Sequence, residues 1–431
     1  MPFEMPPAPR RRIAVIGGGI SGMAAAHLLA DQAQVTLFEA APRLGGHART
    51  VMAGRRGDQP VDTGFIVFNK ANYPHLTALF DRLEVPYVPS NMSFGASFQG
   101  GAMEYALASL DTIFAQRQRA LDPRFLRMLR DILHFNAHAE QALRHPGLTI
   151  REFLRELGTG DWFRDRYLLP FSGAIWSTPC EGVLDFPAQA LVSFFRNHNL
   201  MSNSGHHQWY TVQGGSAQYV QRLQTLLEAQ GVTLRLGTPV RAVRRAPGPE
   251  VKPEGGDWQG FDEVVLACHS DQALALLSDA AGAEQTALAA VAYQPNEAVL
   301  HCDPALMPKR RKCWSSWVYV EPKGPRPDRI ALSYWMNSLQ PIPQDDPMFV
   351  TLNPVQYIDA TKIYDTKSFM HPVYDLAALK AQQTIRAMNG TRATWFCGAW
   401  MRNGFHEDGF ASAVDVVEAM GARLSQPLAA E

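Results

Sequence analysis

The N-terminal region alternates between short apolar runs and glycine, which predicts two β-strands around one helix. Ile13–Ile16 is a continuous apolar run, typical of a buried strand. Ile20–Leu29 is rich in Ala and Leu and predicts a helix, and Val35–Glu39 predicts a second strand. Two strands joined by a helix form a βαβ unit whose strands run parallel. We therefore expect an α/β fold built on a parallel sheet, with α+β character over the whole chain.

The middle of the chain is predicted to be mainly helical before strands return. Residues 72–145 have a mostly helical pattern, and Arg124–Leu143 carries apolar residues at helical spacing. Thr149 and Glu152 form a capping box that opens another helix. The remaining elements are a helix from the break at Gly214–Ser216 to about Gln230, strands at Val232–Leu236, Val240–Arg244 and Glu263–Ala267, a hairpin tip within Ala246–Gly260, strands between Pro-rich turns from Pro295 to Leu352, helices at Asp375–Met388 and Gly409–Leu424, and a strand at Thr394–Cys397.

A glycine-rich motif lies between the first predicted strand and its helix. Gly17-Gly18-Gly19-Ile20-Ser21-Gly22 fits the pattern G-x-G-x-x-G. Gly17 permits a tight turn, Gly19 lets the backbone approach a pyrophosphate, and Gly22 allows close packing of helix and strand. Ser21 in the same turn is a candidate cofactor ligand, and Glu39 is placed to bind a ribose hydroxyl. These features predict a dinucleotide site with phosphates at a helix N-terminus.

A second glycine pair follows the acid. Glu39 would repel a 2′-phosphate, which disfavours NADP. Arg43-Leu44-Gly45-Gly46-His47 offers another close approach of the backbone, with Arg43 near the phosphate charge. Either glycine motif alone can be a simple packing turn. The fingerprint by itself does not separate NAD from FAD.

These motifs resemble those of the flavin amine oxidase and phytoene desaturase superfamily, whose members carry an acid, an Arg and a Gly pair in this order. Members usually have Arg after the Gly pair, whereas this chain has His47. Further stretches similar to the family's motifs are Val61–Phe65, with Thr63, Gly64 and Phe65 in a flavin-facing turn; Thr211–Ser216, before a central helix; Pro239–Arg241, with Val240 in the strand whose backbone holds adenine; Phe396–Trp400; and Gly404–Ala411.

The resemblance implies FAD and a two-dinucleotide-binding-type FAD domain, interrupted by an inserted mixed α/β substrate domain. The implied FAD domain is discontinuous, at residues 1–71, 206–275 and 391–431, and the substrate domain occupies 72–205 and 276–390.

The closing motif is implied to contact the flavin through Gly398, Glu407, Gly409 and Phe410. A helix that begins at Gly409 would point its N-terminus at the flavin C2 carbonyl and N1, where negative charge develops on reduction. Members that bind flavin covalently use a Cys near this motif. Cys397 lies in a predicted buried strand, so we expect non-covalent FAD.

Within the superfamily, the chain looks similar to a bacterial subgroup of FAD-dependent proteins. Ala174–Pro179, Trp314–Trp317 and Phe349–Pro354 carry this resemblance. Some members of the subgroup are implicated in desaturating methyl-branched fatty acyl chains on the way to furan fatty acids. The resemblance therefore implies removal of two hydrogens from the acyl chain of a lipid, with hydride transfer to flavin N5. The alternatives are a flavin amine oxidase and a flavin-binding partner protein without turnover.

Composition narrows the class of protein. The 431 residues are 46% apolar and 19% charged, typical of a globular chain with two or more lobes. The formal net charge of -1 argues against a nucleic-acid partner, and five cysteines without a CxxC pair favour a reducing compartment. We expect neither a signal peptide nor a membrane span, because the apolar runs are short. The predicted location is the cytoplasm, with peripheral contact at the inner face of the membrane left open, and the sequence does not specify an oligomeric state.

Four further features are candidates for chemistry. His206 and His207 are adjacent, so on a strand they would face opposite ways, which argues against a metal site. The basic run Lys309–Lys312 is expected to be a solvated loop or a contact for lipid phosphates. His406 is a candidate acid or base, with positioning of the flavin as its alternative, and Trp400 is the Trp expected to touch substrate.

Overall fold

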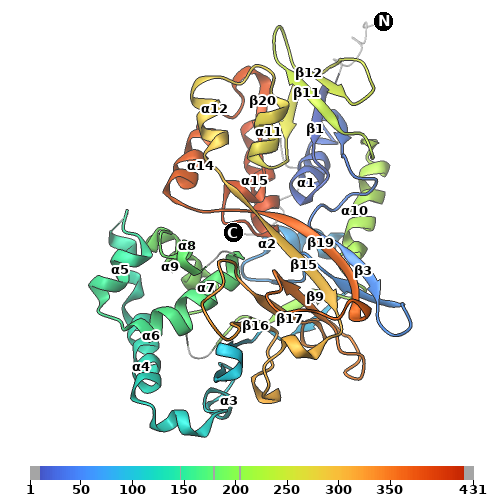
Figure 1. The fold of residues 1–431 in the computed structure, drawn as a ribbon. Helices are drawn as coiled ribbons and strands as arrows, with labels where there is room; N and C mark the ends of the chain where they lie inside the picture. Colours follow the sequence, from blue (N-terminus) through green and yellow to red (C-terminus); the bar gives the residue numbers. More distant parts are fainter. Residues whose placement is uncertain (1–9, 146, 178–179, 203–204, 422–431) are drawn as a thin grey trace, which may run out of the picture.

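The computed structural model describes residues 10–145, 147–177, 180–202 and 205–421, with a parallel sheet at one end and a mixed sheet with a helical lobe at the other (Figure 1). The parallel sheet has the strand order β10-β2-β1-β14-β20. Its strands are β1 (Arg11–Ile16), β2 (Ala33–Phe38), β10 (Thr233–Arg235), β14 (Glu263–Leu266) and β20 (Thr394–Phe396). All four pairings are parallel, which confirms the predicted βαβ unit and α/β class.

Alternate residues of β1 face two different layers of helices, because successive side chains of a strand point to opposite faces. Ile13 and Val15 pack in a core with α1 (Ile20–Leu29), α2 (Pro74–Arg82), α10 (Ala217–Ala229) and α15 (His406–Ala419). Ala14 and Ile16 pack in another core with α11 (Ser270–Leu276), α12 (Gly282–Ala289) and α14 (Leu376–Met388). Both faces of the parallel sheet are therefore covered, which accounts for the continuous apolar run Ile13–Ile16 in β1.

A seven-stranded mixed sheet has the order β19-β15-β18-β17-β16-β7-β8. Its strands are β7 (Phe94–Phe98), β8 (Met103–Ala106), β15 (Tyr293–His301), β16 (Trp317–Val320), β17 (Leu332–Trp335), β18 (Phe349–Leu352) and β19 (Ile363–Pro372), with the short helix α13 (Met336–Leu339) after β17. The long pair β15 and β19 runs between the two ends of the molecule (Figure 1).

Helices of the middle segment pack against this mixed sheet in one continuous core. They are α3 (Leu110–Ile113), α4 (Pro123–His138), α5 (Ile150–Leu157), α6 (Asp161–Phe163), α7 (Leu169–Trp176), α8 (Cys180–Val183) and α9 (Ala188–Asn197). The predicted capping box at α5 is confirmed, because Thr149 Oγ1 accepts from Glu152 N at 3.3 Å and the Glu152 carboxylate accepts from Thr149 N at 2.8 Å.

Three small sheets complete the described part of the chain. They are β3 (Thr50–Ala53) with β4 (Gln59–Asp62); β5 (Val67–Asn69), β9 (Trp209–Val212) and β6 (Tyr87–Ser90); and β11 (Val240–Arg244), β12 (Glu250–Pro253) and β13 (Gln259–Gly260). Among the described helices, none is long and apolar enough to cross a membrane.

One predicted helix boundary was wrong. Residues 72–145 are mainly helical as predicted, with the strands β6, β7 and β8 between the helices. The last helix does not begin at Gly409 but at His406, where the Asp408 carboxylate accepts from Phe405 N and closes the first turn. The predicted end of that helix, at 422–424, lies outside the described residues, as do residues 178–179 of the subgroup motif.

The two-domain division stays a prediction, and three helices near its boundaries pack on the parallel sheet. The helices α2, α12 and α14 belong by sequence to the predicted substrate domain, yet each contributes to a core that contains residues of β1.

Candidate cofactor and substrate cavity

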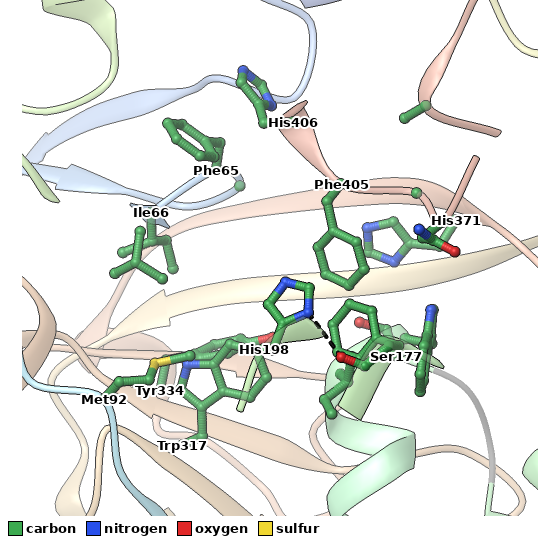
Figure 2. Close-up of a pocket in the computed structure, with 18 of the residues that line it drawn as sticks. Phe65, Ile66, Met92, Ser177, His198, Trp317, Tyr334, His371, Phe405 and His406 are labelled. Carbon is green, nitrogen blue, oxygen red and sulfur yellow. Dashed lines mark hydrogen bonds between the residues drawn. The ribbon is translucent and has the colours of Figure 1, made fainter. Parts of the chain in front are cut away.

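A cavity of about 1400 Å³ extends from the glycine turn after β1 to the apolar face of α4. Gly17–Ser21 and Glu39 line one end, and Leu129, Ile132 and Leu133 line the other. Figure 2 shows part of the wall between these ends, where Phe65, Ile66 and His406 lie across from Met92, Trp317 and Tyr334. The cavity thus joins the parallel sheet to the helical lobe.

The glycine turn packs closely against the backbone on one side and faces the open cavity on the other. Gly17 has a φ of 112°, and a Cβ there would lie 2.7 Å from Ala267 O. A Cβ at Gly22 would collide with the carbonyl oxygen of Gly17. Gly19, in contrast, has no atom within 4 Å of an added Cβ, so it faces the cavity. The first turn of α1 therefore presents backbone N–H groups without helical acceptors to the cavity.

Glu39 and the second glycine pair adjoin this turn. The Glu39 carboxylate lines the cavity and accepts from Gly18 N at 2.5 Å and Ala41 N at 2.7 Å. An added Cβ at Gly46 would lie 3.1 Å from Gly19 Cα, so the two glycine turns touch. Arg43 donates to the carbonyl oxygens of Leu44, Gly46 and Ala48. Arg43 and Gly45 are not among the residues that line the cavity, and Arg43 braces the Gly45-Gly46 turn.

Three histidines meet in the cavity beside the glycine pair. The ring centroid of His47 lies 6.0 Å from that of His269 and 5.7 Å from that of His371, and Asn296 Nδ2 lies 2.9 Å from His371 Nδ1. Among the described residues, His47 Nε2 is buried and has no hydrogen-bond partner. Burial, with the neighbouring histidines, lowers the pKa of His47 to about 3 and that of His371 to about 4. Burial also lowers the pKa of His269, so all three imidazoles are neutral at pH 7.

The turn after β4 brings Thr63, Gly64 and Phe65 to the cavity wall. A Cβ at Gly64 would collide with the carbonyl oxygen of His47, which fixes glycine at this place. The turn is held by Asp62, a buried carboxylate that accepts from Ser216 N at 2.9 Å and from Gln340 Nε2 at 2.9 Å.

His406 forms the first residue of α15 and lines the cavity. Its ring stacks on Phe65 with centroids 4.0 Å apart, and its Nε2 lies 2.6 Å from the Tyr219 hydroxyl. Burial lowers the pKa of His406 to about 3 and raises the pKa of Tyr219. Both groups are therefore uncharged at neutral pH, and Tyr219 donates to the imidazole.

Three residues of the closing motif lie elsewhere than the sequence resemblance implied. Glu407, Gly409 and Phe410 do not line the cavity. The Glu407 carboxylate accepts from the N–H groups of His75 and Leu76 at 2.9 Å each, and so caps α2. A Cβ at Gly409 would lie 2.8 Å from Ile20 Cγ2 on α1, and the Phe410 ring stacks on the His75 ring. These residues join α15 to α1 and α2 because the helix begins one turn earlier than expected.

Trp400 and Gly398 form the wall after β20. Trp400 is only 2% exposed, lines the cavity, and donates through Nε1 to Cys268 O at 3.1 Å. A Cβ at Gly398 would lie 2.5 Å from Trp400 Nε1, so the glycine leaves room for the indole. Val240, which begins β11, lies outside the set of residues that line the cavity.

The end of the cavity away from the glycine turn is lined mainly by apolar and aromatic residues, with uncharged polar residues such as Ser109 and Asn136 among them. Glu39 is the one Asp, Glu, Lys or Arg among the described residues that line the cavity, and it lies at the opposite end. His198 Nδ1 is 3.0 Å from Phe194 O, and Phe194 stacks on Phe405 with centroids 5.0 Å apart. Other lining residues in this part are Ile66, Met92, Phe94, Leu107, Phe171, Ile175, Trp176, Trp317, Tyr334 and Leu352.

A sequence model of the flavin containing amine oxidoreductase family matches residues 20–350, which is more than half of the chain. The chain belongs to this family. A flavin cofactor is therefore indicated for it. The expected resemblance to the flavin amine oxidase and phytoene desaturase superfamily is confirmed.

Among curated relatives, a carotenoid phi-ring synthase of Streptomyces griseus is 28% identical over 279 residues, which cover 60% of this chain and 52% of that protein. The chain thus spans about half the length of this curated relative. A CLA-producing fatty acid isomerase from P. acnes has a TM-score of 0.67 at 17% identity, covering 95% of this chain and 98% of that one. A putrescine oxidase bound to putrescine has a TM-score of 0.68 at 16% identity, covering 96% and 99%. These two structures show a shared fold.

The residues at the glycine end of the cavity fit a flavin dinucleotide. Gly19 faces open space, the N-terminus of α1 favours negative charge, and Glu39 offers carboxylate lone pairs to a hydroxyl. The buried, unpartnered His47 Nε2 can bind a polar group of a ligand.

Several cavity residues were missed by sequence reasoning. His371 comes from β19, which was not predicted because half of its residues are exposed and they carry no apolar pattern. His269 lies two residues after the predicted strand Glu263–Ala267, and its place just beyond the end of a strand was a usable signal. His206 and His207 line the cavity, and within the described residues no cluster of three or more His, Cys, Asp or Glu is arranged to hold a metal.

Proposed function

We propose that the protein is an FAD-dependent oxidoreductase that removes two hydrogens from a long apolar substrate. FAD is held without a covalent bond, and the substrate is a fatty acyl chain of a lipid, methyl-branched as the sequence resemblance implies. The observation that carries the proposal is one cavity with a dinucleotide cradle at one end and an uncharged aromatic and aliphatic chamber at the other.

The chamber is suited to an acyl chain rather than to a charged molecule. No described lining residue outside the cofactor end is an Asp, Glu, Lys or Arg. A charged substrate would lose its water there without a counter-charge, at a large cost in free energy. The fold shared with a fatty acid isomerase and the sequence likeness to a carotenoid ring synthase support an apolar substrate.

Non-covalent binding is supported by the state of the two cysteines near the cavity. Cys397 is fully buried, and burial raises its pKa. Cys268 lines the cavity, but burial raises its pKa to about 12, so it is a thiol and a poor nucleophile at pH 7.

The geometry indicates which part of the reaction the cofactor performs and which part the protein performs. Bound FAD would supply a two-electron acceptor for a hydride from a substrate carbon. The substrate loses a hydride and a proton from neighbouring carbons, which together reduce the bound flavin, and the product gains a double bond. His406 is neutral and already accepts from Tyr219, so it positions the wall beside Phe65 rather than carrying charge. The apolar chamber holds the chain in register and excludes water.

An amine oxidase is the second candidate, and one observation favours it. Trp317 and Tyr334 meet edge to face with centroids 5.4 Å apart in the apolar chamber. Aromatic faces attract ammonium groups through cation–π interactions. The fold shared with a putrescine oxidase is compatible with this alternative.

The decisive experiment follows the flavin. The purified protein is denatured and filtered, and FAD is expected in the filtrate; flavin retained on the polypeptide would contradict the non-covalent proposal. The native protein is then mixed anaerobically with a methyl-branched fatty acyl lipid in detergent micelles or with aliphatic amines. Bleaching of the flavin by the lipid is expected, and bleaching by amines alone would overturn the lipid proposal.

Two variants test whether the bleaching depends on the chamber. Leu129 on α4 lines the cavity, whereas the exposed Leu376 on α14 does not. Leu129→Glu is expected to slow bleaching by the lipid strongly while flavin content stays normal, because it places a carboxylate in the apolar chamber. Leu376→Glu is the control and should leave the rate unchanged.

A further inference from the structure

Four large leucines are exposed together on the segment that contains α3 and α4. Leu110 is 74% exposed, Leu121 87%, Leu126 43% and Leu133 54%. We call these four residues the leucine face. In Figure 1 the turn between α3 and α4 lies at the lower edge of the molecule, away from the parallel sheet. Exposed apolar side chains gathered on one short segment are unusual on a protein that meets only water.

The leucine face is continuous with the apolar end of the cavity. Leu110 and Leu133 line the cavity and are also exposed, so the cavity opens between them. On α4, Leu126, Leu129 and Leu133 follow at helical spacing and form one stripe from the chamber to the surface. An apolar molecule that enters or leaves here passes over leucine side chains.

The surroundings of the leucine face are strongly basic. Residues 110–138 hold five Arg against three Asp, and the run Lys309–Lys312 adds four cations, whereas the whole chain has a formal net charge of -1. The run lies beside α3, since Lys312 Nζ is 2.8 Å from the Asp111 carboxylate. The side chains of Arg124, Arg127 and Arg130 are 67%, 59% and 70% exposed. Positive charge therefore flanks the exposed leucines.

We propose that the leucine face docks on a bilayer that contains anionic phospholipids, and that the acyl substrate passes between the bilayer and the cavity at this point. The leucines enter the boundary between head groups and acyl chains, while the flanking Arg and Lys side chains meet lipid phosphates. The basic side chains lie beside the exposed leucines, as binding to a membrane interface requires. This proposal rests on the proposed function because it treats the chamber as the site of an acyl chain. Vesicle binding can nevertheless be measured without turnover.

The test is flotation of the flavin-loaded protein with lipid vesicles. It should float with vesicles of phosphatidylcholine mixed with phosphatidylglycerol, float much less with phosphatidylcholine alone, and be released by high salt. The double variant Leu121→Ser/Leu126→Ser alters leucines that do not line the cavity, and it should weaken binding by about tenfold or more because two side chains no longer leave water. Lys309→Gln/Lys312→Gln should weaken binding to the anionic vesicles alone.

The matched control is on α14, where Leu376 is 48% exposed and Lys380 is also exposed. Leu376→Ser/Lys380→Gln should bind vesicles like the wild type. The proposal is overturned if the wild type does not float with anionic vesicles, or if control and leucine-face variants lose binding equally. It is also overturned if the leucine-face variant floats normally but loses a dimer on size exclusion, since a second copy would then cover the face.

A separate measurement, flavin bleaching in detergent micelles, tests the proposed function. Flavin bleaching by lipid in detergent micelles does not need a bilayer. Loss of vesicle binding with normal bleaching would overturn the docking surface alone, and vesicle binding without bleaching by any lipid would overturn the substrate assignment alone.

Discussion

The hydroxyl of Tyr219 and Nε2 of His406 lie 2.6 Å apart and join α10 to the first turn of α15 at the cavity wall. Burial keeps the phenol protonated and the imidazole neutral, so the tyrosine is the donor. This bond fixes the histidine ring against Phe65.

Removing the donor tests how much this bond contributes. Tyr219→Phe leaves a buried acceptor without a partner, and we expect the free energy of unfolding to fall by about 1–3 kcal/mol. Urea denaturation measures the change. Tyr357 is 84% exposed, and Tyr357→Phe is the control that should change little. Equal stability of Tyr219→Phe and the wild type would show that the bond is not formed.

The neutral imidazole of His406 predicts a specific dependence of stability on pH. Its folded pKa of about 3 lies below the unfolded value of about 6.5, so below pH 6.5 the unfolded chain binds a proton that the fold does not. The contribution is complete above pH 6.5 and is lost as pH falls toward 3. Relative to His406→Gln, the wild type should lose about 1.4 kcal/mol of unfolding free energy per pH unit between pH 6 and 4. A constant difference between the two proteins across this range would mean that His406 titrates normally.

Gly19 is predicted to matter to the cofactor and not to the fold. Its φ is -75° and an added Cβ meets no protein atom, so Gly19→Ala should change the unfolding free energy of the flavin-free protein by less than about 0.5 kcal/mol. The same methyl group occupies the space where the backbone approaches a pyrophosphate, so the Kd for FAD should rise by about tenfold or more. Fluorescence titration with FAD measures it. Gly260→Ala, also at an open position, is the control. Unchanged FAD affinity in Gly19→Ala would remove the turn from the cofactor site.

Gly409 is predicted to matter to packing. A Cβ there would lie 2.8 Å from Ile20 Cγ2 and 2.9 Å from Ser21 Oγ, so Gly409→Ala should push α15 from α1 and reduce the free energy of unfolding by about 1–3 kcal/mol. Ser21→Ala removes one of the two obstructing atoms, and the double variant should lose less stability than the sum of the single changes. Additive losses would contradict this contact.

The fold was predictable where local signals agree. The bounds of the predicted helix Ile20–Leu29 and strand Val240–Arg244 match α1 and β11, because glycine spacing, apolar runs and turns point to the same boundaries. β19 was not predictable in this way. Half of its residues are exposed, and its pairing with β15 is a non-local contact that no local pattern encodes.

In the candidate site, too, some features follow from local sequence patterns and others depend on non-local contacts. The glycine turn and Glu39 could be placed from their order along the chain, whereas the meeting of His47, His269 and His371 depends on three distant segments. Glu407 illustrates the limit of motif reasoning. Its neighbours in the motif line the cavity, but a carboxylate one residue along a helix points elsewhere, here to the N–H groups of α2.

The parallel sheet is completed by β20, which pairs with β14 and precedes both Trp400 and the helix α15 that begins at His406. During synthesis, the ribosome must therefore translate the chain as far as β20 and α15 before the last wall of the cavity can form. A nascent chain that stops earlier exposes the edge of β14 as an unpaired strand. The cavity wall that would receive the flavin is therefore complete only after β20 and α15 have been translated.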